Sequence, residues 1–173
     1  MQIRKLTEGD VPTASVIYCG CFAEPPWYEA FDPASVAKEM YETMSWSDAV
    51  MAAAACDGRL VAAAYGFALR RKPDIIAATG APPDAFYLAE IFVDPAARLR
   101  GLSTRLVEAV LAAARKDAGI GVVRTSVDQP IILHIFRKLG WETAAEQEVV
   151  SEKTVDGETV SAPDRRVIMV GRI

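Results

Sequence analysis

The fold of this chain is decided between Phe86 and Trp141, in a stretch that opens with FYLAEIFVDPAARLRGLSTR, residues 86–105. Residues 85–93 are rich in aromatic and β-branched side chains, which predicts a strand that ends at Asp94-Pro95. An arginine-rich turn at residues 98–103 then leads into an amphipathic helix predicted over 102–116. Backbone N–H groups at a helix start are unpaired and carry partial positive charge, so this turn suits a phosphate.

The remainder of the stretch predicts a strand over 122–127 and a short helix over 131–139, between Pro130 and Gly140. In the helix over 102–116 the expected buried stripe is Leu102, Leu106, Val110 and Ala113. In the short helix the expected core residues are Ile131, Ile132, Ile135, Phe136 and Leu139. The only histidine, His134, falls on the polar face of that helix and is expected at the surface.

The N-terminal half predicts a strand over 2–6 and two helices. The first helix follows Asp10 and ends before Glu24-Pro25-Pro26-Trp27, because two prolines cannot continue it. The second begins at Asp32-Pro33, where Asp32 can cap it.

Two Asp-Gly turns organise the remaining segments. Asp57-Gly58 lies between two apolar runs and predicts a hairpin of strands 50–56 and 60–69. Residues 70–84 are expected to form a long loop, because proline and glycine recur there. After Trp141 the chain is expected to form strands around the turn at Asp156-Gly157, and no repeat, linker or second domain is seen. We therefore expect a single domain over 1–173.

Composition excludes several classes of protein. The chain has 173 residues, is 51% hydrophobic and 24% charged, and so predicts a folded domain with a sizeable core. Its formal net charge of −4 argues against a nucleic-acid partner, and no apolar run is long enough for a membrane span. The N-terminus lacks the apolar region of a signal peptide. With one histidine and three cysteines of unpromising spacing, we expect no metal site and reduced thiols in a cytoplasmic protein.

At this point the sequence resembles the GNAT superfamily of acyl-CoA-dependent N-acetyltransferases. The family's Q/R-x-x-G-x-G/A turn is matched by Arg98, Gly101 and, imperfectly, Ser103. Its later N-x-x-A-x-x-x-Y-x-x-x-G-F block corresponds to residues 129–141, with Phe136 at the tyrosine position. The resemblance implies an α/β (α+β) GNAT fold, with a central mixed, mostly antiparallel sheet flanked by helices.

The resemblance implies acetyl-CoA as cosubstrate. The basic turn is expected to hold its pyrophosphate, and backbone groups at the end of the preceding strand are expected to hold the pantetheine. Phe136 is expected to pack against the cofactor. The implied cofactor-binding residues are Phe92, Val93, Arg98, Leu99, Arg100, Gly101, Leu102, Ser103, Thr104, Gln129 and Phe136. An alternative for Arg98 and Arg100 is a solvated pair of surface charges.

The implied reaction is direct transfer of the acetyl group to a primary amine of a small molecule or peptide. An alkyl ammonium must first lose a proton, and Glu90 is the candidate base. An alternative is that Glu90 only binds a cationic substrate or pairs with an arginine. Trp27, Tyr28 and Phe31 are candidates for an acceptor pocket, although they could equally be core aromatics.

Phe136 departs from the family, because a phenyl ring cannot protonate the leaving thiolate. Tyr87, Tyr65 or a water could donate that proton, or the thiolate could leave unprotonated. Tyr87 and Glu90 are separated by three positions, which puts them on opposite faces of a regular strand, so water is the better candidate.

The same departure motivates a rival function, a catalytically silent domain that binds acyl-CoA. A nucleotide-binding Rossmann domain is more remote, because residues 6–10 supply no glycine-rich turn after the first strand. The resemblance leaves a homodimer open and does not identify the acceptor.

Overall fold

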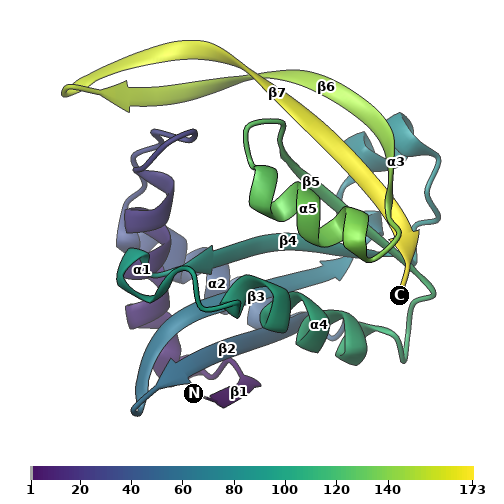
Figure 1. Ribbon diagram of the computed structural model, residues 1–173, viewed down its shortest axis with the longest axis horizontal. Helices are drawn as coiled ribbons and strands as arrows, with labels where there is room; N and C mark the ends of the chain where they lie inside the picture. Colours follow the sequence, from purple (N-terminus) through teal and green to yellow (C-terminus); the bar gives the residue numbers. More distant parts are fainter. Residues whose placement is uncertain (1) are drawn as a thin grey trace.

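The computed structural model describes residues 2–173 and shows a seven-stranded sheet in the order β1-β2-β3-β4-β5-β7-β6 (Figure 1). The strands are β1 Gln2–Lys5, β2 Val50–Cys56, β3 Arg59–Ala68, β4 Phe86–Val93, β5 Ile120–Ser126, β6 Glu142–Val155 and β7 Glu158–Arg172. All neighbours pair antiparallel except β4 and β5, which are parallel. The mixed, mostly antiparallel sheet is therefore confirmed.

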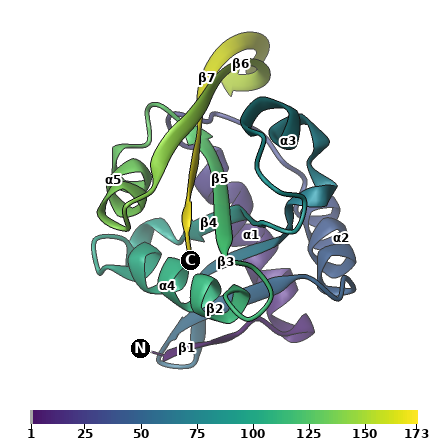
Figure 2. The same cartoon turned by 90° about the vertical axis from the view of Figure 1, so that its right-hand side faces the viewer.

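Five helices cover the two faces of the sheet. They are α1 Val11–Phe22, α2 Pro33–Met44, α3 Pro73–Thr79, α4 Leu102–Ala114 and α5 Pro130–Lys138, with short 3-10 turns at Glu8–Asp10, Leu69–Arg71 and Pro95–Ala97. Helices α4 and α5 pack on one face, while α1, α2 and α3 pack on the other (Figure 2). The Asp32 side chain caps α2 by accepting a hydrogen bond from the Ser35 amide, as the sequence predicts.

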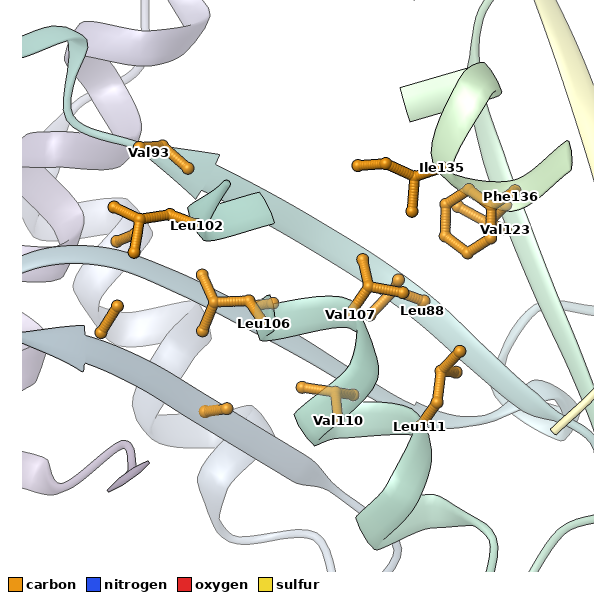
Figure 3. Close-up of a cluster of buried hydrophobic side chains, with 14 of the residues drawn as sticks. Leu88, Val93, Leu102, Leu106, Val107, Val110, Leu111, Val123, Ile135 and Phe136 are labelled. Atoms are coloured by element: carbon orange, nitrogen blue, oxygen red, sulfur yellow. The ribbon is translucent and has the colours of Figure 1, made fainter. Parts of the chain in front are cut away.

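The largest apolar cluster joins α4 and α5 to the sheet (Figure 3). Leu106 and Val110 of α4 are fully buried there, and so is Phe136 of α5. The sheet offers small side chains beneath them, since β2 and β3 contribute Ala52, Ala54, Ala62 and Ala64 to this cluster. Small residues let the helix approach the strands closely, so the alanine-rich hairpin predicted from Asp57-Gly58 forms the floor of the core.

Three local expectations from the sequence were wrong, and they concern residues 70–84, helix α4 and helix α5. Residues 70–84 are not a long loop but contain α3, in which Pro73 opens the helix and Gly80 ends it in the left-handed conformation. Ala114, not Ala113, completes the buried stripe of α4.

In α5 the side chains of Ile131 and Leu139 are 60% and 42% exposed, and Leu133 is buried instead. Ile131 lies in the first turn and Leu139 just past the last, where the helix no longer faces the core.

The strands β4 and β5 separate at one end, and the gap between them determines where the candidate functional site lies. The two strands pair only from Phe86–Gly121 to Leu88–Val123, and within residues 2–173 no strand pairs with this edge of β4 beyond Leu88. On its other side β4 carries a bulge, because Tyr65 and Gly66 of β3 face Glu90 and Leu88, which leaves Ala89 as an extra residue. The bulge and the gap occur at the same point of β4.

The hairpin of β6 and β7 extends beyond the body of the sheet and arches over the segment between α1 and α2 (Figure 1). Lys153 Nζ donates to the Pro26 carbonyl at 2.9 Å, and the Thr154 amide donates to the Tyr28 carbonyl. The hairpin therefore covers one end of the gap between β4 and β5.

Candidate active site

A cavity of about 700 Å³ occupies the gap between β4 and β5. Its walls come from the end of α1, the α1–α2 segment, β4, the turn before α4 and the first turn of that helix, β5, α5 and β7. Of the predicted residues, the cavity is lined by Trp27, Glu90, Phe92, Val93, Arg98, Leu99, Gly101, Leu102, Ser103, Thr104 and Gln129. Residues far apart in the sequence thus share one cavity.

One end of the cavity is the start of α4. Gly101 precedes the helix in the left-handed conformation, with φ of 70°, and open space surrounds the position of a Cβ there. Leu102, Ser103 and Thr104 follow in the first turn, where backbone N–H groups have no partner within the helix. This end can accept an anion through backbone donors.

Arg98 and Cys21 both hold the end of β4 in place. Arg98 Nε donates to the Val93 carbonyl at 3.3 Å, and its guanidinium forms an ion pair with Glu24. Cys21 Sγ donates to the same carbonyl at 3.1 Å, and burial raises the pKa of this thiol. Arg98 is therefore paired with Glu24 and with the end of β4, and it is not a free surface charge.

Glu90 lies in the middle of the cavity wall, half-buried, on β4. Removal of the carboxyl from water raises its pKa to about 8, and the nearby carboxylates Glu29 and Glu39 act in the same direction. The positive charges of Lys72 and Arg166 oppose this rise. A carboxyl with such a pKa exchanges a proton near neutral pH.

The bulge at Ala89 brings Tyr87 to the same sheet face as Glu90, which corrects the expectation from regular alternation. Tyr87 packs in the cluster beneath α3 and also lines the cavity. Burial raises the pKa of its hydroxyl to about 12, so this phenol keeps its proton at neutral pH. Tyr65, the other tyrosine considered, is buried and is not part of the cavity lining.

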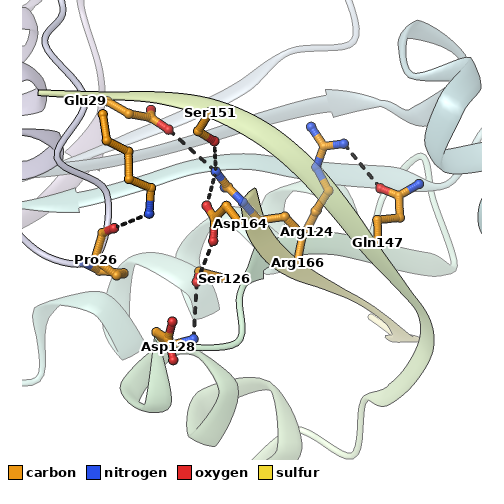
Figure 4. A network of polar contacts seen from close by, with 10 residues as sticks. Pro26, Glu29, Arg124, Ser126, Asp128, Gln147, Ser151, Asp164 and Arg166 are labelled. Carbon is orange, nitrogen blue, oxygen red and sulfur yellow. Dashed lines mark hydrogen bonds and ion pairs between the residues drawn. The ribbon is translucent and has the colours of Figure 1, made fainter. Parts of the chain in front are cut away.

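The second end of the cavity is charged (Figure 4). Arg166 of β7 pairs with the buried Asp164 at 2.6 Å and with Glu29 at 3.6 Å, and its guanidinium lies 4.4 Å from the Trp27 ring centre. Burial raises the pKa of Glu29, an effect that Arg166 partly offsets. Arg124 of β5 also lines this end and pairs with Asp74 of α3 at 3.1 Å.

Four predicted site residues lie outside the cavity lining. Arg100 is exposed on the turn before α4. Phe136 is completely buried against Trp141, with 4.6 Å between the ring centres. Phe31 and Tyr28 flank the α1–α2 segment, where Phe31 packs its edge on Tyr18. None of the four contributes a wall to the cavity.

Sequence reasoning missed Glu29, Arg124 and Arg166. None of them belongs to a motif, and they come from three separate elements. They come together because the β6–β7 hairpin lies over the α1–α2 segment and because β5 pairs with β7.

Within residues 2–173, no group of three or more His, Cys, Asp or Glu residues is arranged to hold a metal ion. His134 is exposed, as predicted. The three cysteines are free thiols. Among the described helices none is long and apolar enough to cross a membrane.

Solved structures with the same fold are acetyltransferases. A ribosomal-protein-alanine N-acetyltransferase from Brucella melitensis aligns over 100% of both chains with a TM-score of 0.78 and 16% identity. The putative acetyltransferase yncA from Salmonella typhimurium, solved with its cofactor acetyl-CoA, covers 99% of this chain and 93% of its own (TM-score 0.76, 14% identity). A phosphinothricin acetyltransferase from Sinorhizobium meliloti, in complex with AcCoA, covers 99% and 88% (TM-score 0.71, 16% identity).

At these identities the likeness shows the fold alone. No curated protein matches this chain in sequence. A family model described as the acetyltransferase (GNAT) family matches residues 21–141, which is more than half of the chain. The sheet with its gap between β4 and β5, the helix start at Gly101 and this match lead to one conclusion: the chain belongs to the GNAT acetyltransferase family.

Proposed function

We propose that this protein transfers the acetyl group of acetyl-CoA directly to the primary amine of a small molecule or peptide. The observation that carries the proposal is that one cavity joins an anion-binding helix start to an ionisable carboxyl, Glu90. The similar solved structures whose names state an acceptor differ in that acceptor. One is named for an alanine of a ribosomal protein and another for phosphinothricin. The fold by itself therefore does not select the acceptor.

The α4 end of the cavity suits the pyrophosphate of CoA. Gly101 leaves space for a close approach of phosphate, and the amides of residues 102–104 can donate to it. The edge of β4 beyond Leu88 has no strand partner on the β5 side, so its backbone groups are available to the pantetheine. Arg98 lines this end as well, with its guanidinium paired to Glu24.

Glu90 is proposed as the base. An ammonium with a pKa near 10 must lose a proton before it can react, and a carboxylate with a pKa of about 8 accepts that proton better than an ordinary carboxylate does. Bound acetyl-CoA supplies a thioester, which the neutral amine attacks to form an amide while CoA leaves as the thiol. Glu90 would take the proton directly or through a water.

Tyr87 is the proposed donor to the leaving sulfur. It lines the cavity on the same face as Glu90, and its hydroxyl stays protonated. Phe136 cannot substitute for it, since the ring is buried in the core. Tyr87→Phe should lower kcat by about tenfold while the Kd of acetyl-CoA stays unchanged, if protonation limits the rate. An unchanged kcat would assign the step to water.

The test of the proposed function combines binding and turnover. Titration with acetyl-CoA should raise the unfolding temperature, because the ligand binds the folded state. Release of CoA thiol is then followed against a panel of primary amines. Binding together with amine-dependent thiol release supports the proposal. Binding without release from any amine would favour the silent acyl-CoA-binding domain, and absence of binding would reject both.

A further inference from the structure

The charged end of the cavity carries both signs of charge. Glu29 and Glu90 contribute carboxyl groups, while Arg124 and Arg166 contribute guanidinium groups, and all four line the cavity. Glu90, Arg124 and Arg166 lie on the sheet face covered by α1, α2 and α3. A purely cationic acceptor would meet the guanidinium groups of Arg124 and Arg166, which stay charged because arginine does not lose its proton in proteins, although each also pairs with a carboxylate.

Arg124 has hydrogen-bond donors to spare. Its Nη1 makes both of its contacts, one to Asp74 at 3.1 Å. The other is to Gln147 Oε1 at 3.5 Å (Figure 4). Within residues 2–173 its Nε and Nη2 have no partner, and the side chain is 26% exposed. A guanidinium offers five N–H donors in a planar fork, so two adjacent nitrogens remain for a bidentate anion.

Arg166 is a second guanidinium near this end of the cavity that favours an anionic group on the acceptor. Asp164 and the Trp27 ring hold its guanidinium in position, and its Nη2 makes the contacts to Asp164, Glu29 and Ser151. Its Nε is buried without a partner among the described residues. A positive charge fixed in this way favours a nearby anion, whereas the adjacent Glu29 and Glu90 favour an amine.

The β6–β7 hairpin, which lies over this end of the cavity, restricts the size of the acceptor. The β6–β7 hairpin is tied to the α1–α2 segment by Lys153 and Thr154, and Arg166 links Ser151 of the hairpin to Glu29. These contacts hold the hairpin against the α1–α2 segment beside the cavity, which favours a small molecule over a polypeptide as the acceptor. A small molecule that enters the cavity would leave them intact.

We propose that the acceptor is a small zwitterion, a primary amine that carries a carboxylate or phosphonate group within a few bonds. Arg124 holds the anionic group in a forked contact, with Arg166 adding positive charge, while the amine faces Glu90. This proposal rests on the proposed acetyl transfer and adds the class of acceptor to it.

The test uses matched pairs of acceptors with the full-length protein. The proteinogenic L-amino acids are compared with the amines that correspond to their decarboxylation, and with aminoalkylphosphonates of similar length. The best amino acid or aminophosphonate should exceed the corresponding amine without the anionic group by at least about 100-fold in kcat/KM. The two anionic series distinguish a carboxylate from a phosphonate site.

Arg124→Met should remove most of this preference, measured as the ratio of kcat/KM for the zwitterion to kcat/KM for the plain amine, and leave the Kd of acetyl-CoA unchanged. Arg165→Met is the matched control, since Arg165 is the exposed neighbour of Arg166 on the opposite face of β7. A wild-type protein that prefers the plain amines would overturn the proposal. So would an Arg124→Met variant that keeps the full preference.

Binding measurements separate this proposal from the proposed function. Calorimetry on the CoA complex should detect the preferred zwitterion but not its decarboxylated counterpart, and Arg124→Met should weaken that binding. If binding follows this pattern without any thiol release, the zwitterion site stands and the acetyl transfer is wrong. If no zwitterion binds, the zwitterion site is wrong, whatever the turnover with plain amines.

Discussion

The two ends of the cavity are built in different ways. The α4 end is made mainly of backbone from one contiguous turn, residues 98–104, and its donors are fixed by a helix start. The other end is made of ionisable side chains from several elements, with Glu29, Glu90, Arg124 and Arg166 as its charged members. Backbone donors suit a cosubstrate that never varies, whereas side chains can change from protein to protein without disturbing the sheet. The comparison teaches that cosubstrate binding and acceptor choice are separable in this molecule.

Gly101→Val should have the largest effect, because it changes the α4 end of the cavity, where acetyl-CoA is proposed to bind. A β-branched residue at a φ of 70° is strained, and its side chain would fill the space left for phosphate. We expect acetyl-CoA affinity to fall by at least about 100-fold, measured by calorimetry.

Gly80→Val provides the matched control. Gly80 has a φ of 66° and equally open surroundings, but it ends α3 outside the cavity. It should suffer the same backbone strain and keep its affinity for acetyl-CoA. Equal loss in both variants would mean that strain, not phosphate contact, explains the result.

Glu90→Gln should impair the reaction at the charged end of the cavity and leave cosubstrate binding at the α4 end intact. We expect kcat to fall by about 100-fold with acetyl-CoA affinity unchanged, because a general base is removed. The wild-type rate should rise with pH and level off above about pH 8, as the carboxyl loses its proton, whereas the rate of the variant should keep rising toward the pKa of the amine. A variant with normal kcat but a raised KM for the amine would make Glu90 an anchor for the substrate.

The same carboxyl should affect stability. Its pKa is about 8 in the folded protein and ordinarily near 4.5, so between these values the folded state holds a proton that the unfolded state has lost. The contribution of the protonated form is therefore fully present below pH 4.5 and is lost as pH rises through about 8. Relative to wild type, Glu90→Gln should gain about 3–4 kcal/mol in unfolding free energy between pH 5 and pH 8, because the folded state alone holds this proton over most of that range. Denaturant unfolding of both proteins at the two pH values measures this, and a constant difference would contradict the raised pKa.

Phe136 should have the smallest effect on turnover. Phe136→Leu is expected to change kcat by less than about threefold and to destabilise the fold by about 1 kcal/mol, since the ring packs in the core away from the cavity. Phe136→Tyr would bury a hydroxyl and cost about 1–3 kcal/mol if it finds no partner. A clear increase of kcat in Phe136→Tyr would show that the hydroxyl reaches the reacting sulfur after all.

The two ends also differ in how far the sequence predicts them. The α4 end depends on neighbours in the chain, and its strand, glycine and helix start are all visible in residues 86–105. The hairpins at Asp57-Gly58 and Asp156-Gly157 were predictable for the same reason, because each turn is encoded by adjacent residues. The start and end signals of α3, Pro73 and Gly80, were also present, but prolines and glycines nearby favoured a loop.

The charged end could not be predicted in this way. Arg124 and Arg166 meet only because β5 pairs with β7 in a particular register, and no local pattern fixes that register. The bulge at Ala89 turned Tyr87 to the side of Glu90 and had one local signal, Gly66, where a Cβ would lie 2.2 Å from the Tyr87 carbonyl oxygen. Exposure of Ile131 likewise follows from its place in the first turn of α5, where it lines the cavity, and the helix period alone does not show this.

The most direct test of the account is a crystal structure of the protein with bound CoA. We predict that the pyrophosphate contacts the amides of residues 101–104 and that the pantetheine follows the open edge of β4 beyond Leu88. The sulfur should then lie in the cavity beside Glu90, with Arg124 and Arg166 beyond it and free of CoA contacts. Pyrophosphate bound by Arg124 or Arg166, with the α4 start empty, would contradict the assignment of the two ends.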